Sequence, residues 1–264
     1  MFHLFKTNNL TSTESVDVIE KIVYEYLKPL GFRKHGRTLH RFVDGDISQV
    51  VHLQNGSPEK GVLGILWVNL GIRVPECMDR TFSDNEPLKK YYHEYECNIR
   101  TNLGALVDGK DTSYNLKKDP DKIGDDIVKR LRKYVMPVFE VLNSRDAILI
   151  HRREYPSFDQ FNSHMILLEE AMIAGRRGNI AEASRLFNAY YQKVLAEYHH
   201  DVEYGTKTYL KKGQSIMYRN AKTKETETIT ATKSGYITIY CAKQYHLAYL
   251  EELAQELGIV LYDP

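Results

Sequence analysis

The sequence has few of the residues that build disulfide frameworks or closed zinc sites. The 264 residues include only three cysteines, Cys77, Cys97 and Cys241, and no two of them have the short CxxC spacing of a metal-binding turn. A reducing compartment suits such a chain better than an oxidising one. The N-terminus, MFHLFKTNNL, also lacks the basic segment and the long apolar run of a secretory signal. We therefore expect a cytoplasmic protein.

Long apolar segments and an excess of one charge are missing as well. The most apolar run, residues 62–72 (VLGILWVNLGI), is shorter than the roughly 20 residues that a membrane-spanning helix needs. The chain has 36 Lys and Arg against 35 Asp and Glu, with 22 against 21 up to Ile150 and 14 against 14 after it. A dedicated nucleic-acid binder typically has a strong basic bias. We therefore expect no membrane association, and nucleic acid is not the partner that this balance favours.

The common motifs of catalysis are absent too. The sequence contains no GxxxxGK[ST] loop, no GxGxxG after a strand and no GxSxG turn. Among its ten histidines, His199 and His200 precede Asp201 but point to different sides of a helix, and His93 with Cys97 supplies two ligands, too few for a structural zinc site. We expect surface or core histidines, no bound metal and no cofactor. These absences do not exclude an enzyme, but they leave no specific reason to predict one.

What the first half does contain is a clear order of helical and strand patterns. Thr11 and Glu14 have the spacing of a capping box in front of apolar residues at helical spacing. Asp44-Gly45 separates two alternating segments, which is a strong hairpin signal. The basic residues 33–37 are expected to form a solvated turn, and Pro137 is expected to bend the second helix. The predicted elements are helices over residues 13–29 and 121–143, strands over residues 38–43, 47–54 and 62–74, and a further strand pair or edge element over residues 97–116.

After residue 150 the pattern changes. Two amphipathic segments joined by a basic Gly turn predict a helical hairpin, and one such unit does not make a repeat array. The fold class is therefore α+β: an antiparallel sheet with helices on one face, followed by a helical hairpin and a small C-terminal α+β element. We place domains at residues 1–150 and 151–264 and leave open whether they pack as one unit. The later predicted elements are helices over residues 161–174, 180–198 and 244–257 and strands over residues 215–219, 226–232, 236–241 and 259–262.

The first part also contains a characteristic series of motifs: LKPLGFRKHGRTLHRF, VVHLQNGS, WVNLGIRV, ECNIRTNLGAL and VMPVFEVLNS. In their order and spacing, these resemble the bacterial domain-of-unknown-function family 4304 over about residues 16–150. The resemblance implies an α+β domain with no attached reaction, and some family members lie in toxin and immunity gene neighbourhoods. One departure is Asn98, which stands where the family commonly has a histidine. Chemistry that relied on that histidine would be lost here.

Two surfaces are candidates for function. The first is residues 82–96 (FSDNEPLKKYYHEYE), whose acids and tyrosines would suit a basic protein partner, unless the segment is merely a solvated loop. The second is a set of polar side chains on otherwise apolar strands, which would line a polar sheet face unless they satisfy loop backbone internally. The residues predicted to bind a partner are Asp84, Glu86, Tyr91, Tyr92, Glu94, Tyr95 and Glu96, and those of the polar sheet face are Arg41, Gln54, Asn69 and Arg100.

From these features we expect a non-enzymatic binding protein of the inhibitor or immunity type, which covers the active site of a bacterial toxin or effector. The choice of a toxin comes from the family resemblance. Two alternatives stay open. One is a nucleic-acid-processing or nucleotide-binding enzyme that uses the polar sheet face, and the other is a structural adaptor that works through the helical hairpin.

Overall fold

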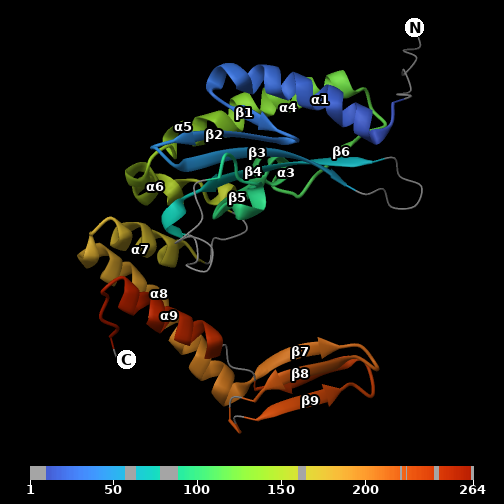
Figure 1. Cartoon of the computed structure of the whole chain (residues 1–264). Coiled ribbons are helices and arrows are strands. Elements are labelled where there is room, and N and C mark those ends of the chain that lie inside the picture. Colours follow the sequence, from blue (N-terminus) through green and yellow to red (C-terminus); the bar gives the residue numbers. More distant parts are fainter. Residues whose placement is uncertain are drawn as a thin grey trace. The chain divides into compact units, whose positions relative to one another are not determined.

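The computed structural model describes residues 10–56, 64–77, 89–159, 165–220, 222–223, 225–240 and 244–262. The chain forms two compact units, residues 1–166 and residues 167–264 (Figure 1). Both combine helices with antiparallel strands, so the predicted α+β class is confirmed. No helix in the described part of the chain is long and apolar enough to cross a bilayer.

The first unit is built on an antiparallel sheet with the strand order β1-β2-β3-β4-β5, and β6 also pairs with β4. Strands that follow one another in sequence lie side by side, as short connections favour. The β2–β3 hairpin turns at Asp44 and Gly45, whose φ angles are both positive, 47° and 84°. Such a backbone matches the right-handed twist of the paired strands. The strands are β1 (Arg33–His35), β2 (Thr38–Val43), β3 (Ile47–Gly56), β4 (Ile65–Arg73), β5 (Ile99–Asn102) and β6 (Tyr114–Asn115).

Helix α1 (Ser12–Leu27) begins with the predicted capping box. Thr11 Oγ1 accepts a hydrogen bond from the Glu14 N–H at 3.3 Å, and the Glu14 carboxylate accepts one from the Thr11 N–H at 2.8 Å. Two N–H groups at the start of the helix are satisfied in this way. The chain then passes through a short 3-10 turn (Lys28–Leu30) and leaves the helical path at Gly31, whose φ is 89°.

One face of the sheet is covered by helices and forms the core (Figure 1). Cα partners on neighbouring strands point to the same face, so Leu39, Val51 and Leu70 form one row. All three are fully buried. Helix α1 packs against β3 and against α4 (Pro120–Arg130). Apolar residues at helical spacing complete this core: Val16, Ile19, Val23, Leu27, Ile123, Ile127 and Leu131.

The second predicted helix is interrupted before its proline. Helix α4 is followed by a π-helical stretch (Leu131–Val135) and then by α5 (Met136–Val141). Pro137 has no N–H to donate, and its ring clashes with a regular preceding turn, so a wider turn just before it relieves both problems. The disturbance expected at Pro137 therefore takes the form of a π-helical stretch.

Two local structures of the first unit differ from the prediction. Residues 33–35 form the edge strand β1 instead of a turn, and their exposed, mostly basic side chains are typical of an edge that must not pair with another chain. Residues 97–116 contain strands β5 and β6 as expected, but α3 (Leu103–Asp108) lies between them. Asn102 caps this helix by accepting a hydrogen bond from the Ala105 N–H at 2.7 Å. An asparagine at this position is a helix-start signal that the sequence analysis passed over. The unit ends with α6 (Arg145–His151) and 3-10 turns at Arg152–Glu154 and Pro156–Phe158.

The second unit contains the predicted helical hairpin and four short strands. The hairpin turns near Gly178, whose φ is 82°, and the C-terminal helix packs along its second member. In the small β part, β7 pairs with β10 and β8 pairs with β9, all antiparallel. The elements are α7 (Ile166–Arg176), α8 (Ile180–Tyr204), β7 (Thr206–Leu210), β8 (Ser215–Arg219), β9 (Thr226–Thr230), β10 (Gly235–Ile239) and α9 (Gln244–Glu256).

The strand predicted over residues 259–262 is wrong, because this segment has no strand partner. It lies along α8 instead. Asn188, which is 4% exposed, donates from Nδ2 to the Val260 carbonyl at 3.1 Å and accepts from the Tyr262 N–H at 2.8 Å. A buried amide on a helix thus satisfies the backbone groups that a neighbouring strand would otherwise satisfy.

Candidate functional site

The structure separates Arg41 from the other residues of the predicted polar sheet face. Arg41 pairs with Gln49 across the hairpin, on the face that the helices cover. It donates from Nε to Gln49 Oε1 at 2.8 Å, from one terminal nitrogen to the Leu30 carbonyl at 2.9 Å and from the other to Glu140 at 2.6 Å. Gln49 is fully buried and donates in turn to the Phe139 carbonyl at 2.6 Å. Arg41 therefore joins a strand to the helices, and placing it beside Asn69 was wrong.

The remaining three residues do share a face, which we call the open face of the sheet. Gln54 and Asn69 are held together, because Asn69 Nδ2 donates to Gln54 Oε1 at 2.6 Å. Arg100 pairs with Glu94 instead, at 2.7 Å between its terminal nitrogen and Oε1. These bonds lie within the protein, but they join side chains to one another and not to loop backbone, as the alternative had expected.

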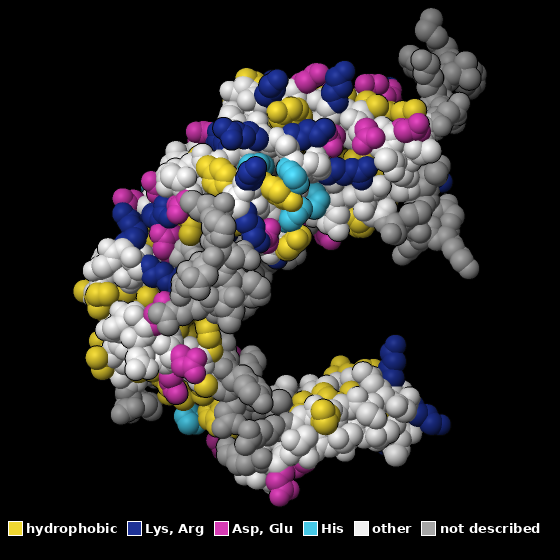
Figure 2. Space-filling view, in the orientation of Figure 1, with side chains coloured by type: hydrophobic (Ala, Val, Ile, Leu, Met, Phe, Trp, Pro, Cys, Tyr) yellow, Lys and Arg dark blue, Asp and Glu magenta, His cyan; other side chains and the backbone are white. Residues whose placement is uncertain are grey.

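The open face carries a feature that the sequence analysis missed, a continuous cluster of aromatic and imidazole rings. His35 stacks on Tyr91 with ring centroids 3.5 Å apart, Tyr91 meets His93 edge-on at 5.3 Å, and His93 stacks on Tyr95 at 5.1 Å. Figure 2 shows histidine side chains gathered with hydrophobic ones on this unit. The eight rings of this cluster, each in contact with at least one other, are His35, His40, Phe42, His52, Tyr91, Tyr92, His93 and Tyr95.

Part of this signal was visible in the sequence. Thr38, His40 and Phe42 alternate along one predicted strand and therefore share a face. The pairing register adds His52, which lies opposite Thr38. The tyrosines come from a segment that sequence periodicity does not place, because residues 89–97 form no strand and only one 3-10 turn, η3 (Glu94–Glu96).

The ring cluster has a buried layer and an exposed layer. His40 is 3% exposed and Tyr92 is 4% exposed, whereas Tyr95 is 63% exposed. Tyr92 lies under the Arg73 guanidinium, whose carbon is 3.9 Å from the ring centroid, and its hydroxyl accepts from the Lys89 N–H at 3.2 Å. Tyr92 is thus a fixed part of the interior, and its predicted place on an exposed surface is wrong.

The acids of the predicted partner surface are also largely used inside the protein. Glu94 is 6% exposed and holds Arg100, so its expected exposure is wrong too. Glu96 accepts from the His93 N–H at 2.8 Å and from Lys89 Nζ at 3.0 Å. Burial raises the pKa of Glu96, but these hydrogen bonds outweigh it, and the net effect lowers that pKa. Asp84 and Glu86 lie outside the described residues, so the described part of the segment presents rings more than carboxylates.

The surroundings of the two strand histidines disfavour their charged form. Burial is the main cause that lowers the pKa of His40, and the charges of Arg33 and His35 add to it. The pKa of His52 is lowered by burial first and then by His93 and Arg37. The Nδ1 atoms of both histidines are buried and have no hydrogen-bond partner among the described residues. Nor do three or more His, Cys, Asp or Glu side chains in the described part of the chain converge as metal ligands.

These shifts predict that acid destabilises the first unit. The ordinary pKa of histidine is about 6.5, and those of His40 and His52 are lower in the folded protein. As the pH falls below about 6.5, the unfolded chain therefore binds protons that the folded protein does not yet bind, and the free energy of unfolding falls. Urea unfolding at pH 7.5, 6.5 and 5.5, followed by Trp67 fluorescence, should show this decline. The double variant His40→Gln/His52→Gln should flatten it, whereas His151→Gln, at a partly exposed position outside the ring cluster, should not. An equal pH dependence in both variants would contradict the assignment.

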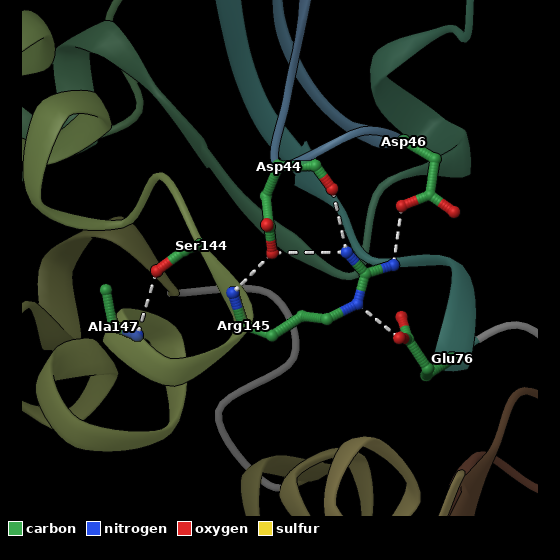
Figure 3. A network of polar contacts seen from close by, with 6 residues as sticks. All are labelled: Asp44, Asp46, Glu76, Ser144, Arg145 and Ala147. Carbon is green, nitrogen blue, oxygen red and sulfur yellow. Dashed lines mark hydrogen bonds and ion pairs between the residues drawn. The ribbon is translucent and has the colours of Figure 1, made fainter. Parts of the chain in front are cut away.

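A second polar cluster fixes the hairpin turn next to the sheet (Figure 3). Arg145 donates to the Asp44 carbonyl at 3.0 Å, to Asp46 at 2.5 Å and to Glu76, and its own N–H donates to the Asp44 carboxylate at 3.1 Å. Burial lowers the pKa of Arg145, but the hydrogen bonds with Glu76 and Asp46 raise it by more than burial lowers it. The net effect raises the pKa of Arg145, so the guanidinium stays charged. Glu76 lies in η2 (Pro75–Cys77), at the start of the segment that leads to the tyrosines. We call this group of four residues the Arg145 clasp.

Asn98, the departure noted in the family resemblance, has a structural role. It is 6% exposed, and its Oδ1 accepts a hydrogen bond from the Val74 N–H at 2.8 Å. This bond joins the start of β5 to the end of β4, so the residue supports the sheet and not the ring cluster.

Comparison with known proteins matches part of the chain to a family. No curated protein and no protein of solved structure matches the chain. One family model does, and the matched residues run from within α1 to the end of α5, so they include the whole sheet and the ring cluster but not the second unit. Residues 23–141 thus match the family that the order of the motifs predicted, which is described as Domain of unknown function (DUF4304).

Proposed function

We propose that this protein is a binding protein that captures a protein partner through the exposed rings of the ring cluster. The observation that carries the proposal is the stack His35–Tyr91 and His93–Tyr95, in which Tyr95 remains 63% exposed. Tyrosine is enriched among the residues that dominate binding energy, because it buries a large area and keeps a polar tip. Half-buried Tyr91 and exposed Tyr95, each stacked on a histidine, are therefore better anchors than the separated polar residues of the sheet.

The rings are also held in place before any partner arrives. His93 is fixed by its N–H bond to Glu96 and by a contact of 3.3 Å between its Nδ1 and Thr38 Oγ1. Glu94 anchors the same turn to β5 through Arg100. Side chains that are already ordered lose less conformational freedom on binding, so more of the contact energy appears as affinity.

The finer proposal is an inhibitor or immunity-type protein of the cytoplasm, which occludes the active site of a bacterial toxin or effector. Its support is the resemblance drawn from the order of the motifs, which implies toxin and immunity gene neighbourhoods. The match over residues 23–141 supports the family and no particular function. The internal pairing of Glu94 and Glu96 changes the recognition chemistry, because rings and imidazoles replace the acidic surface expected for a basic partner.

The test uses the product of a toxin-like reading frame next to the gene as the partner. Tyr91→Ala and Tyr95→Ala should each raise the dissociation constant about 30-fold, since truncating a central anchor commonly costs about 2 kcal/mol. Isothermal titration with the full chain measures this, and cell growth in the presence of the toxin measures protection. Tyr134→Ala is the matched control, because Tyr134 is a partly exposed tyrosine of the same unit outside the ring cluster. Tyr92 is left intact because its burial would confound binding with folding.

Three outcomes would contradict the proposal. Unchanged affinity and protection in the Tyr91→Ala/Tyr95→Ala double variant would exclude the ring cluster as the docking surface. Turnover of a nucleotide or nucleic acid, lost in His93→Gln, would favour the enzyme. Capture that survives both tyrosine changes but is lost on changes in the α7–α8 hairpin would favour the adaptor.

A further inference from the structure

The small β part of the second unit has a charge that the even balance of the whole chain conceals. Residues 206–240 contain seven Lys or Arg and two acidic residues, a net charge of +5, although the chain as a whole has +1. One of the two acids, Glu227, is used internally, because it accepts from the Tyr218 hydroxyl at 2.5 Å and from Asn220 Nδ2 at 2.6 Å. The other, Glu225, belongs to the β8–β9 connection. Lysines therefore outnumber acidic side chains in the described part of residues 206–240.

A pair of exposed tyrosines lies in the middle of one outward face. Tyr209 on β7 and Tyr236 on β10 are direct partners in the register, and their rings meet edge-on with centroids 5.2 Å apart. They are 51% and 73% exposed. On the same face the next pair is Lys207 opposite Thr238, one step of about 7 Å along the strands. Two large rings thus stand in solvent on a strand surface otherwise made of Lys and Thr.

Lysines flank this pair at the other end as well. Lys211 and Lys212 lie in the β7–β8 turn and Lys233 lies in the β9–β10 turn. The two turns are joined, because the Lys212 N–H donates to Ser234 Oγ at 3.0 Å. All of these lysines, and Lys207, are exposed, and none of their ammonium groups has an acidic partner in the described part of the chain. Figure 2 shows Lys and Arg side chains at this end of the strands and acidic ones at the opposite end.

We propose that the β7–β10 face binds single-stranded nucleic acid, with bases stacked on Tyr209 and Tyr236 and phosphates held by the flanking lysines. Stacking on aromatic rings combined with a positive backbone track is how proteins bind single strands without sequence preference. An acidic peptide would use the lysines but offers no flat rings to the tyrosines. A duplex keeps its bases stacked on one another, so the tyrosines would gain nothing from it. This inference is independent of partner binding by the ring cluster.

The test is fluorescence anisotropy of the full chain with a labelled 20-nucleotide oligo(dT) at 50 to 200 mM salt. We expect binding that weakens as salt rises. Tyr236→Ala should weaken it about 5- to 150-fold, the range found for loss of one stacked base. Tyr236→Phe should keep most of the affinity, since the ring remains. The triple variant Lys211→Gln/Lys212→Gln/Lys233→Gln should lower the slope of log K against log salt by about 2, at roughly 0.7 per phosphate contact.

Matched variants separate this face from non-specific effects. Tyr262→Ala removes another exposed tyrosine of the same unit, and Lys110→Gln/Lys117→Gln/Lys118→Gln removes the same charge from exposed positions elsewhere. Neither should change binding by more than about twofold. Circular dichroism and thermal melting of every variant exclude unfolding as the cause. The proposal is overturned if oligo(dT) does not bind at 50 mM salt, if Tyr236→Ala behaves like Tyr262→Ala, or if a duplex or poly-glutamate of equal charge binds as tightly.

Discussion

Replacing Arg152 with alanine should lower the free energy of unfolding of the first unit by about 3–5 kcal/mol, the usual cost of removing one partner of a buried ion pair. Arg152 and Asp159 are each 1% exposed. Two guanidinium nitrogens of Arg152 reach the same oxygen of Asp159, at 2.7 and 2.6 Å. The alanine variant takes this guanidinium away from a carboxylate that is 1% exposed, which is more costly than losing the attraction itself.

The position of the pair explains why its loss should affect the whole unit. It closes the segment that packs on β5, where Thr101 Oγ1 donates to the Ser157 carbonyl at 2.9 Å. Phe158, fully buried, meets Phe139 of α5 edge-on at 5.5 Å. A displaced Asp159 would draw this aromatic contact away from the core as well.

Urea unfolding measures the effect cleanly, because the only tryptophan, Trp67, lies in β4 of the first unit. Arg153→Ala is the control. Arg153 is the next residue along the chain and is exposed, so its replacement should lower the free energy of unfolding by about 0.5 kcal/mol or less. The double variant Arg152→Met/Asp159→Leu should recover part of the loss, because it leaves no uncompensated charge. A loss below about 1 kcal/mol in Arg152→Ala would contradict the argument.

Arg145→Ala should cost about 2–4 kcal/mol, because one side chain in the Arg145 clasp serves three carboxylates at once. Glu76 and Arg145 are each 14% exposed at the side chain, so neither is fully solvated when the other is removed. Asp44, with its positive φ of 47°, would also lose the contacts that help to hold an uncommon backbone conformation. Arg145→Lys should fall between wild type and alanine, since an ammonium keeps the charge but not the planar fork.

The same change should loosen the η2 turn, which carries Glu76. The Arg145 clasp holds Glu76, which lies at one end of the segment whose other end carries Tyr91 and Tyr95. Hydrogen exchange of the Glu76 and Cys77 amides should therefore quicken in Arg145→Ala. Trp67 fluorescence in urea gives the stability, and Arg37→Ala, which loses a single 3.7 Å contact with the exposed Asp17, is the control at about 0.5 kcal/mol or less. Equal losses in the two variants would show that the clasp is an ordinary surface contact.

The sequence predictions were correct where the signal acts between residues close together in the sequence, and they failed where it acts between distant residues. The capping box of Thr11 and Glu14 was correct because both partners lie within one helical turn. The hairpin at Asp44-Gly45 was correct because two residues decide its backbone. The amphipathic patterns placed the helices and central strands, since a buried face repeats with the period of its element. The strand predicted over residues 259–262 failed because Asn188, far away in sequence, satisfies that backbone.

The functional surface was decided almost entirely by tertiary structure. Strand alternation alone put His40 and Phe42 on one face, and the resemblance to a family was confirmed over residues 23–141. Only the pairing register placed Arg41 opposite Gln49 on the covered face and Asn69 on the open one. The tyrosines come from an irregular segment whose position depends on contacts with β1, β2 and β5. Period and propensity describe neighbours along a chain, whereas the ring cluster arises from residues about 40 to 60 positions apart, which only the folded sheet brings into contact.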